Sequence, residues 1–245
     1  MNVKDSKSNV DRKALVGTAG AQLIQDGMLA GIGTGSTMAF LIEELGRRVR
    51  QERLRVTAVP TSFQSRMLCL RLGIPVREMQ DTSDLDLAID GADEVDPGLD
   101  LIKGGGASLT REKIVAAMAR EFVVVVDESK LVARLGQSFA VPIEVLPSAL
   151  GYVEKRIATL GAASALRLGV AKDGPVVTDN GQFILDLRFP AGTDLRHADL
   201  ELHRTPGVVE TGLFFGFAQQ ALVARSTPAG QLAVQTLRAA PRPGG

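Results

Sequence analysis

Residues 85–126 read LDLAIDGADEVDPGLDLIKGGGASLTREKIVAAMAREFVVVV, and this stretch decides the fold. The pattern predicts a strand at 85–90, a glycine-rich loop, a helix at 110–120 and, in the apolar run 122–126, a fully buried strand. Two strands separated by a helix form the repeating unit of a parallel sheet that is covered by helices.

The same alternation runs back to the start of the chain. It predicts a helix at 11–25, a strand at 28–32, a helix at 37–50, a strand at 54–59 and a helix that begins after 60–62. The fold class is therefore α/β, with an open parallel sheet that carries helices on both faces.

A second pattern begins near residue 137. The predicted elements are a strand at 141–145, a helix at 147–160, strands at 165–168 and 183–188, a helix at 194–204 and a strand at 207–213. The order βαββαβ is typical of a small ferredoxin-like α+β unit. Strands at 221–224 and 232–236 are expected to return to the first sheet. The predicted domains are thus 1–136 plus 214–238, an insertion at 137–213, and a flexible tail at 239–245.

The composition narrows the classes of function. Lys plus Arg and Asp plus Glu both number 28, and this balance argues against nucleic-acid binding and against a polybasic membrane contact. The one cysteine, Cys69, excludes an internal disulfide, suits a reducing cytoplasm and is expected to be a buried structural thiol. The first ten residues are polar, so no signal peptide is expected, and no apolar run approaches the ~18 residues of a membrane span. We expect a cytoplasmic protein.

GIGTGSTMAF at residues 31–40 follows a predicted strand and opens a helix. The free N–H groups and the dipole at such a helix start favour an anion, so Thr34, Gly35, Ser36 and Thr37 are candidate phosphate ligands. The segment matches neither a dinucleotide-binding fingerprint nor a Walker A loop. The alternative is a glycine-rich turn with a Ser/Thr cap.

DGAD at residues 90–93 ends the next predicted strand and supplies two carboxylates, Asp90 and Asp93. Ligands bind beyond the carboxyl ends of strands in open α/β sheets, so this turn and GTGST can meet at one site. A solvated acidic turn and a divalent-metal site are the alternatives. The only histidines, His197 and His203, lie in the predicted insertion, and the calcium-loop spacing is not matched, so we expect no metal.

Lys103, the glycines 104–106 and Glu112 follow within the same strand–loop–helix unit. A lysine can hold an oxyanion, closely spaced glycine N–H groups can approach a ligand, and a carboxylate can move a proton. Each residue alone has an ordinary structural explanation, such as a solvated lysine or a carboxylate that complements a helix dipole. Lys13 and Lys130 are each either solvated charges or phosphate contacts.

The motifs together resemble type A ribose-5-phosphate isomerase. The resemblance rests on GIGTGST, PTSFQSRMLCLRLGIP, DLAIDGADEVDPGLDLIKGGGASLTREKIVA, FVVVVDESKLV, PIEVLP, VVTDNGQFILD and PGVVETGLF, in order over about residues 11–215. It implies a Rossmann-like domain with a ferredoxin-like insertion. It also implies interconversion of ribose 5-phosphate and ribulose 5-phosphate in the pentose phosphate pathway without a metal or other cofactor, and a homodimer or dimer of dimers.

The resemblance also implies roles for individual residues. Glu112 would move the proton between C2 and C1 through a cis-enediol, Asp90 would help to open the furanose ring, and Lys103 with the amides of Gly104, Gly105 and Gly106 would stabilise the enediolate. Asp93 would bind sugar hydroxyls or assist ring opening beside Gly91 and Ala92. Thr34, Gly35, Ser36 and Thr37, with Lys13 and Lys130, would hold the phosphate.

One electrostatic question stays open from the sequence. A helix N-terminus lowers the pKa of Glu112 and weakens it as a base, whereas burial or the nearby Asp90 and Asp93 would raise that pKa.

Two other functions compete with the isomerase. An isomerase or deaminase of an aminosugar phosphate would be expected to use a histidine near the ligand edge. A sugar-phosphate sensor would be expected to carry a DNA-binding helix pair and would be free to lose Glu112 or Lys103.

Overall fold

The buried run Phe122–Asp127 (β6) lies in the middle of a six-stranded sheet with the order β13-β12-β6-β3-β1-β2. The structure, a computed structural model, describes residues 7–171 and 173–239. The remaining strands of this sheet are β1 (Leu29–Ile32), β2 (Thr57–Pro60), β3 (Leu87–Asp90), β12 (Gln220–Ser226) and β13 (Leu232–Arg238). All neighbours are parallel except β12 and β13, which form an antiparallel hairpin. The predicted open parallel sheet is confirmed.

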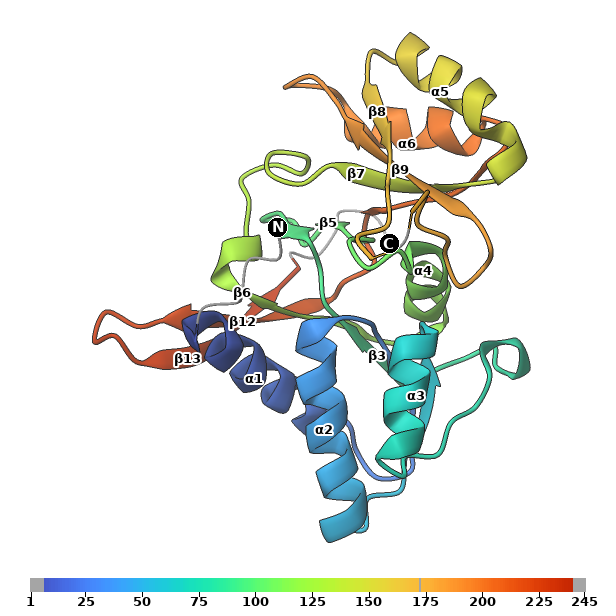
Figure 1. Ribbon diagram of the computed structural model, residues 1–245. Helices are drawn as coiled ribbons and strands as arrows, with labels where there is room; N and C mark the ends of the chain where they lie inside the picture. The colour runs from blue at the N-terminus through green and yellow to red at the C-terminus, as the bar shows by residue number, and fades with distance from the viewer. Residues whose placement is uncertain (1–6, 172, 240–245) are drawn as a thin grey trace.

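Helices cover both faces of this sheet because alternate side chains of a strand point to opposite sides. Val123 and Val125 belong to one core with residues of α1 (Lys7–Gln22), α2 (Ser36–Gln51) and α3 (Phe63–Arg71). Val124 and Val126 belong to a second core with residues of α4 (Leu109–Met118). Figure 1 shows α1, α2 and α3 side by side in the lower part of the molecule.

The second unit is a four-stranded antiparallel sheet with the order β10-β7-β9-β8. Its elements follow the predicted order βαββαβ and lie at the top of Figure 1. They are β7 (Val141–Val145), α5 (Leu150–Thr159), β8 (Ala163–Leu166), β9 (Phe183–Arg188), α6 (Leu195–His203) and β10 (Val208–Thr211). Buried residues of α5, α6 and the strands form a third core.

A three-stranded sheet between these units was not predicted. It has the order β11-β5-β4 and is antiparallel, with β4 at Glu94–Val95, β5 at Leu101–Ile102 and β11 at Leu213–Phe214. Strands of two residues are too short for a hydrophobic period to reveal.

The predicted strand at 207–213 is divided at Gly212 between two sheets. Gly212 donates its N–H to the carbonyl of Pro142 at 2.7 Å and accepts from the N–H of Lys103 at 2.9 Å. A Cβ at this position would lie 2.2 Å from the carbonyl oxygen of Lys103, so only glycine allows the chain to cross here.

Other boundaries shift by a few residues. The first helix begins at Lys7 rather than at residue 11, the strand predicted at 54–59 is Thr57–Pro60, and the strand predicted at 165–168 is Ala163–Leu166. Three short 3-10 helices are added, η1 (Met79–Asp81), η2 (Glu128–Lys130) and η3 (Pro147–Ala149). Of the predicted tail, only Ala239 is among the described residues.

Candidate active site

The turn that joins β1 to α2 presents backbone N–H groups beyond the carboxyl end of the sheet. Gly35 precedes the helix with a φ of 109°, a conformation that favours glycine. The first N–H groups of a helix have no partner within the helix, so this turn suits an anion. The hydroxyl of Thr34 is hydrogen-bonded to those of Thr61 and Ser62, each at 2.7 Å, and so holds the turn against the start of α3.

Asp90 ends β3 directly beside this turn and is only 3% exposed. Its Oδ1 accepts from the N–H groups of Thr34 at 3.1 Å and Gly91 at 2.7 Å. A Cβ at Gly33 would lie 2.0 Å from the same oxygen, so the carboxylate can take this place only because residue 33 is glycine. The turn and the carboxylate therefore position each other.

Lys103 follows β5 and is the centre of a buried cluster of charges. Its Nζ lies 2.9 Å from Oδ2 of Asp90 and 3.2 Å from Oε2 of Glu112, and it donates to the carbonyl of Gly91 at 2.6 Å. The same Nζ lies 5.6 Å from the ring centre of Phe214, a cation–π distance. Phe214 is fully buried, so the apolar segment that directly follows the predicted insertion packs against this side of the cluster.

Glu112 reaches the cluster from the first turn of α4 and is 5% exposed. Burial is the largest influence on its pKa and raises it to about 8; Lys103 acts to lower it, and Asp90 and Asp93 raise it. Burial and the two aspartates therefore outweigh the opposing effect of Lys103, and the net result is a raised pKa for Glu112. A base whose pKa lies near the working pH is well suited to proton transfer.

The other two charges respond to the same surroundings. Burial raises the pKa of Asp90, although Lys103 and the N–H groups of Gly91 and Thr34 oppose it. Burial alone would lower the pKa of Lys103, but Asp90 and Glu112 raise it above its usual value. Lys103 is therefore held in its charged form beside Glu112.

Asp93 and the glycine loop also line the pocket. Oδ2 of Asp93 accepts from the N–H of Gly105 at 2.7 Å. The loop of residues 104–106 is therefore bonded to the DGAD turn, and both line the same pocket as Glu112.

One pocket gathers nearly all the residues that the sequence singled out. It is lined by Lys13, Thr34, Gly35, Ser36, Thr37, Gly91, Ala92, Asp93, Lys103, Gly104, Gly105, Gly106, Glu112, Val125, Val126, Asp127 and Lys130. Asp90 is the exception, since its carboxylate lies behind the wall against Lys103.

Gly33 and Asp127 belong to the site but were not among the predicted site residues. The close approach to Asp90 that makes Gly33 necessary joins two distant strands, and no local pattern reveals it. Asp127 ends β6, and its Oδ1 accepts from the N–H of Ser129 at 2.9 Å, so it caps η2, which carries Lys130. Its place directly after the buried strand was the available signal.

Among residues 7–171 and 173–239, no three His, Cys, Asp or Glu side chains gather closely enough to hold a metal ion. In the same ranges, no helix has both the length and the apolar character that a membrane crossing requires.

Comparisons with known proteins agree with this geometry. The family description "Ribose 5-phosphate isomerase A (phosphoriboisomerase A)" matches residues 57–227. The ribose-5-phosphate isomerase A of Thermosynechococcus vestitus is 52% identical over 86% of this chain and 90% of its own length. The solved ribose 5-phosphate isomerase A of Methanocaldococcus jannaschii is 46% identical, with a TM-score of 0.86 over 94% of this chain and 99% of that one.

A further solved structure is a D-ribose-5-phosphate isomerase in complex with phospho-erythronic acid. It is 42% identical, with a TM-score of 0.86 over 93% of this chain and 98% of that one. A family match over more than half of the chain, together with these sequence identities, establishes the family of this protein. The chain belongs to the ribose 5-phosphate isomerase A family.

Proposed function

We propose that this pocket interconverts D-ribose 5-phosphate and D-ribulose 5-phosphate through a cis-enediolate. The observation that carries the proposal is the buried cluster of Asp90, Lys103 and Glu112 beside an anion-binding turn, in a chain of the ribose 5-phosphate isomerase A family. The reaction removes a proton from a carbon next to a carbonyl, so it needs a base and a group that stabilises an oxyanion.

The phosphate would bind at residues 34–37. The free N–H groups at the start of α2 supply donors, and Lys13 and Lys130 supply positive charge around the same pocket. This end fixes the sugar so that its C1 and C2 lie at Glu112 and Lys103.

Glu112 would transfer the proton. From aldose to ketose it takes the proton from C2, the electron pair forms the C1–C2 double bond, and negative charge develops on O1. Lys103 and the N–H groups of the loop at 104–106 that are not bonded to Asp93 stabilise that charge. Return of the proton to C1, with transfer of the hydroxyl proton from O2 to O1, completes the ketose.

Asp93 and Asp90 would have different roles. Asp93 lines the pocket, so we assign it the contact with sugar hydroxyls and the proton transfers of ring opening. Ring opening was predicted first for Asp90, but Asp90 does not line the pocket and its carboxylate is paired with Lys103 at 2.9 Å. We therefore propose that Asp90 acts through Lys103 by holding its charge and position.

A coupled assay on ribose 5-phosphate with a metal chelator present tests the proposal. Turnover is expected, and its absence would contradict the function. Turnover of glucosamine 6-phosphate but not of ribose 5-phosphate would favour the aminosugar-phosphate enzyme. Against that function, no histidine is found among the described residues that line the pocket. Binding without turnover would favour a sensor. Loss of activity with chelator would contradict the metal-free reaction.

We also propose boundaries for two domains. Residues 1–136 with 214–238 would form the Rossmann-like catalytic domain, and residues 137–213 a ferredoxin-like insertion. The separate cores of the large sheet and of the four-stranded sheet support this division.

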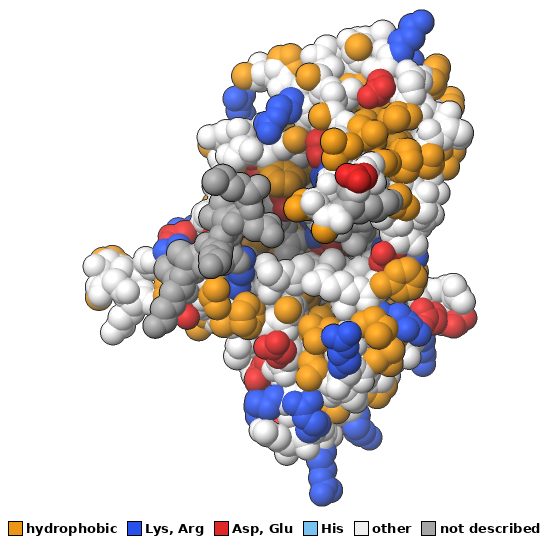
Figure 2. All heavy atoms as spheres, in the orientation of Figure 1, with side chains coloured by type: hydrophobic (Ala, Val, Ile, Leu, Met, Phe, Trp, Pro, Cys, Tyr) orange, Lys and Arg blue, Asp and Glu red, His pale blue; other side chains and the backbone are white. Residues whose placement is uncertain are grey.

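We further propose that the protein is cytoplasmic and that it forms a homodimer or a dimer of dimers. Phe63, Met67 and Leu70 of α3 are each at least 46% exposed, and Figure 2 shows hydrophobic side chains gathered over this helix. Such a surface supports self-association. Light scattering at several concentrations measures the mass, and a monomer throughout would contradict this assembly.

A further inference from the structure

Arg167 joins the four-stranded sheet to the glycine loop of the pocket. It follows β8, and its Nη1 donates to the carbonyl oxygens of Gly104 at 2.7 Å and Gly105 at 3.2 Å. Asp186 of β9 holds the other side of the guanidinium, through Nε at 2.9 Å and through Nη2. The side chain of Arg167 is 16% exposed, and its charge is paired with that of Asp186.

These contacts fix the direction of two peptide groups. In a trans peptide the C=O and the N–H lie in one plane and point in opposite directions. Arg167 holds the carbonyls of Gly104 and Gly105 on one side, so the N–H groups of Gly105 and Gly106 point to the other. The N–H of Gly105 reaches Oδ2 of Asp93 at 2.7 Å.

The N–H of Gly106 is the second group that this geometry directs. Gly106 lines the pocket, and its N–H donates to no other residue within 7–171 or 173–239. Glycine has little conformational preference of its own, and the loop's internal hydrogen bond, from the N–H of Ala107 to the carbonyl of Gly104 at 3.0 Å, holds only the first of these peptide groups. Among the described residues, the carbonyl of Gly105 accepts only from Arg167. A cation at the carbonyl end also draws electrons from the peptide and makes its N–H a stronger donor.

We propose that Arg167 is a positioning residue of the isomerase, which aims the N–H of Gly106 at the substrate oxygen and fixes Asp93 through Gly105. The inference rests on the proposed function. It gives the insertion a part in the chemistry, since Arg167 and its anchor Asp186 both belong to it while the groups that they orient belong to the catalytic loop.

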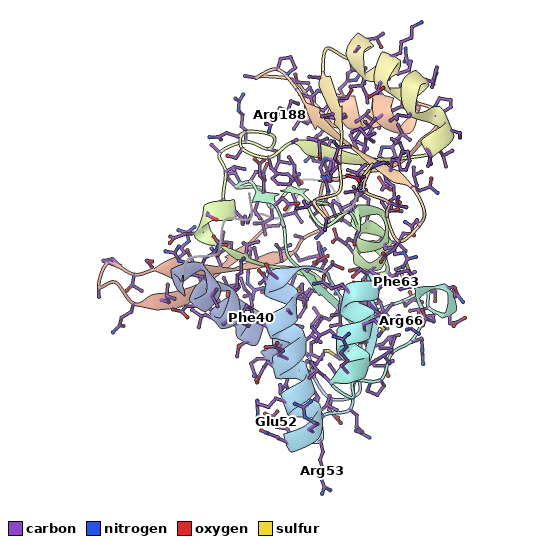
Figure 3. All side chains as sticks on the ribbon, viewed as in Figure 1. Phe40, Glu52, Arg53, Phe63, Arg66 and Arg188 are labelled. Atoms are coloured by element: carbon purple, nitrogen blue, oxygen red, sulfur yellow. The ribbon has the colours of Figure 1, made fainter. Side chains whose placement is uncertain are left out.

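Arg188 provides a matched control. It is exposed, it lies at the end of β9, and it lines the same hollow beside Gly105 that Arg167 and Asp186 line. Figure 3 labels it on the upper unit. Arg188→Met and Arg167→Met make the same change of charge and side-chain type, but only the second removes contacts to the glycine carbonyls.

The test compares kcat, KM, melting temperature and the dissociation constant of phospho-erythronic acid, whose carboxylate carries negative charge near the place of the enediolate oxygens. We expect Arg167→Met to lower kcat by at least about 10-fold, as expected for misplaced catalytic donors. KM should change by less than about threefold, because the phosphate ligands are untouched. Phospho-erythronic acid should bind at least about 10-fold more weakly, whereas ribitol 5-phosphate, which lacks that charge, should bind nearly as before.

Two further variants keep the inference falsifiable if Arg167→Met folds poorly. Arg167→Lys keeps the charge but not the fork and should recover part of kcat. Asp186→Asn leaves the guanidinium without its charged anchor and should also lower kcat. Unchanged kcat in all three variants, or losses that disappear once the folded fraction is corrected for, would overturn the inference. Inactivity of the unmodified enzyme and of Arg188→Met would instead count against the proposed function.

Discussion

The ammonium group of Lys103 lies 3.2 Å from Oε2 of Glu112, and both side chains are at most 5% exposed. A cation this close to the proposed base lowers its proton affinity, but burial raises it by more. Lys103 also lies 2.9 Å from Asp90, so two carboxylates share one positive charge. This sharing keeps the lysine charged while Glu112 remains basic enough to take a proton from carbon.

The raised pKa of Glu112 predicts an acid limb in the pH profile. The base must be deprotonated, so log kcat/KM should fall with a slope near one below about pH 8 and level off above it. Initial rates from pH 6.5 to 9.5 measure this. A flat profile across that range would show that no group with such a pKa acts as the base.

Lys103→Met should remove the stabilising charge. We expect kcat to fall by about 10²–10³, the typical cost of losing one oxyanion donor. The pKa of Glu112 should rise further, because the nearby cation is gone, and the acid limb should move to higher pH.

Lys113→Met is the control for this change. Lys113 is adjacent to Glu112 in sequence and lies 4.9 Å from the ring centre of Phe214, but its Nζ pairs with Glu210 at 2.7 Å. Its turnover should remain within about threefold of the unmodified enzyme. Equal losses in both variants would mean that the loss does not depend on contact with Glu112.

Gly106→Ala should reduce activity more than stability. A Cβ at Gly106 would meet no heavy atom nearer than Cγ2 of Thr34 at 3.7 Å, so the fold tolerates it, but the methyl group would occupy space in the pocket. We expect kcat/KM to fall at least about 10-fold, as for a small misplacement of substrate.

Gly33→Ala should lower stability as well as activity, because its Cβ would lie 2.0 Å from Oδ1 of Asp90, the partner of Lys103. It should lower the melting temperature by several degrees, which corresponds to about 1–3 kcal/mol of overpacking. Thermal melts of the two alanine variants separate these effects. An unchanged kcat/KM in Gly106→Ala would contradict the placement of substrate against this loop.

Lys130→Met should weaken phosphate binding. Lys130 lines the pocket from η2, so its loss should raise KM for ribose 5-phosphate about 10-fold, the effect of about 1.4 kcal/mol, with a smaller change in kcat. The KM effect should shrink as salt is added, because salt screens the charge. A KM equal to that of the unmodified enzyme at low salt would exclude a phosphate contact for this lysine.

Much of the fold follows from local pattern. The run Phe122–Asp127 and the helices around it have periods that identify parallel strands and their cover, and strand ends locate the pocket. The strands at Glu94–Val95 and Leu101–Ile102 have no such period, because two residues carry no repeat.

The residues of the candidate site also fall into those that local sequence patterns reveal and those that they do not. Residues 34–37, 90–93 and 103–106 were found because each stands in a strand-end or loop motif of its own. Arg167 was not, because its partners Gly104 and Gly105 are more than 60 residues away and no motif links them. The position of Asp90 behind Lys103 is likewise a tertiary contact that spacing along the chain does not specify.

The most direct test of the central claim is turnover of Glu112→Gln. Glutamine keeps the size of the side chain but cannot accept the proton, so the variant should bind phospho-erythronic acid within about fivefold of the unmodified enzyme while kcat falls by at least about 10³. Exchange of the C2 proton of ribose 5-phosphate with deuterated solvent should disappear with it. Turnover and exchange near those of the unmodified enzyme would contradict the assignment of Glu112 as the base.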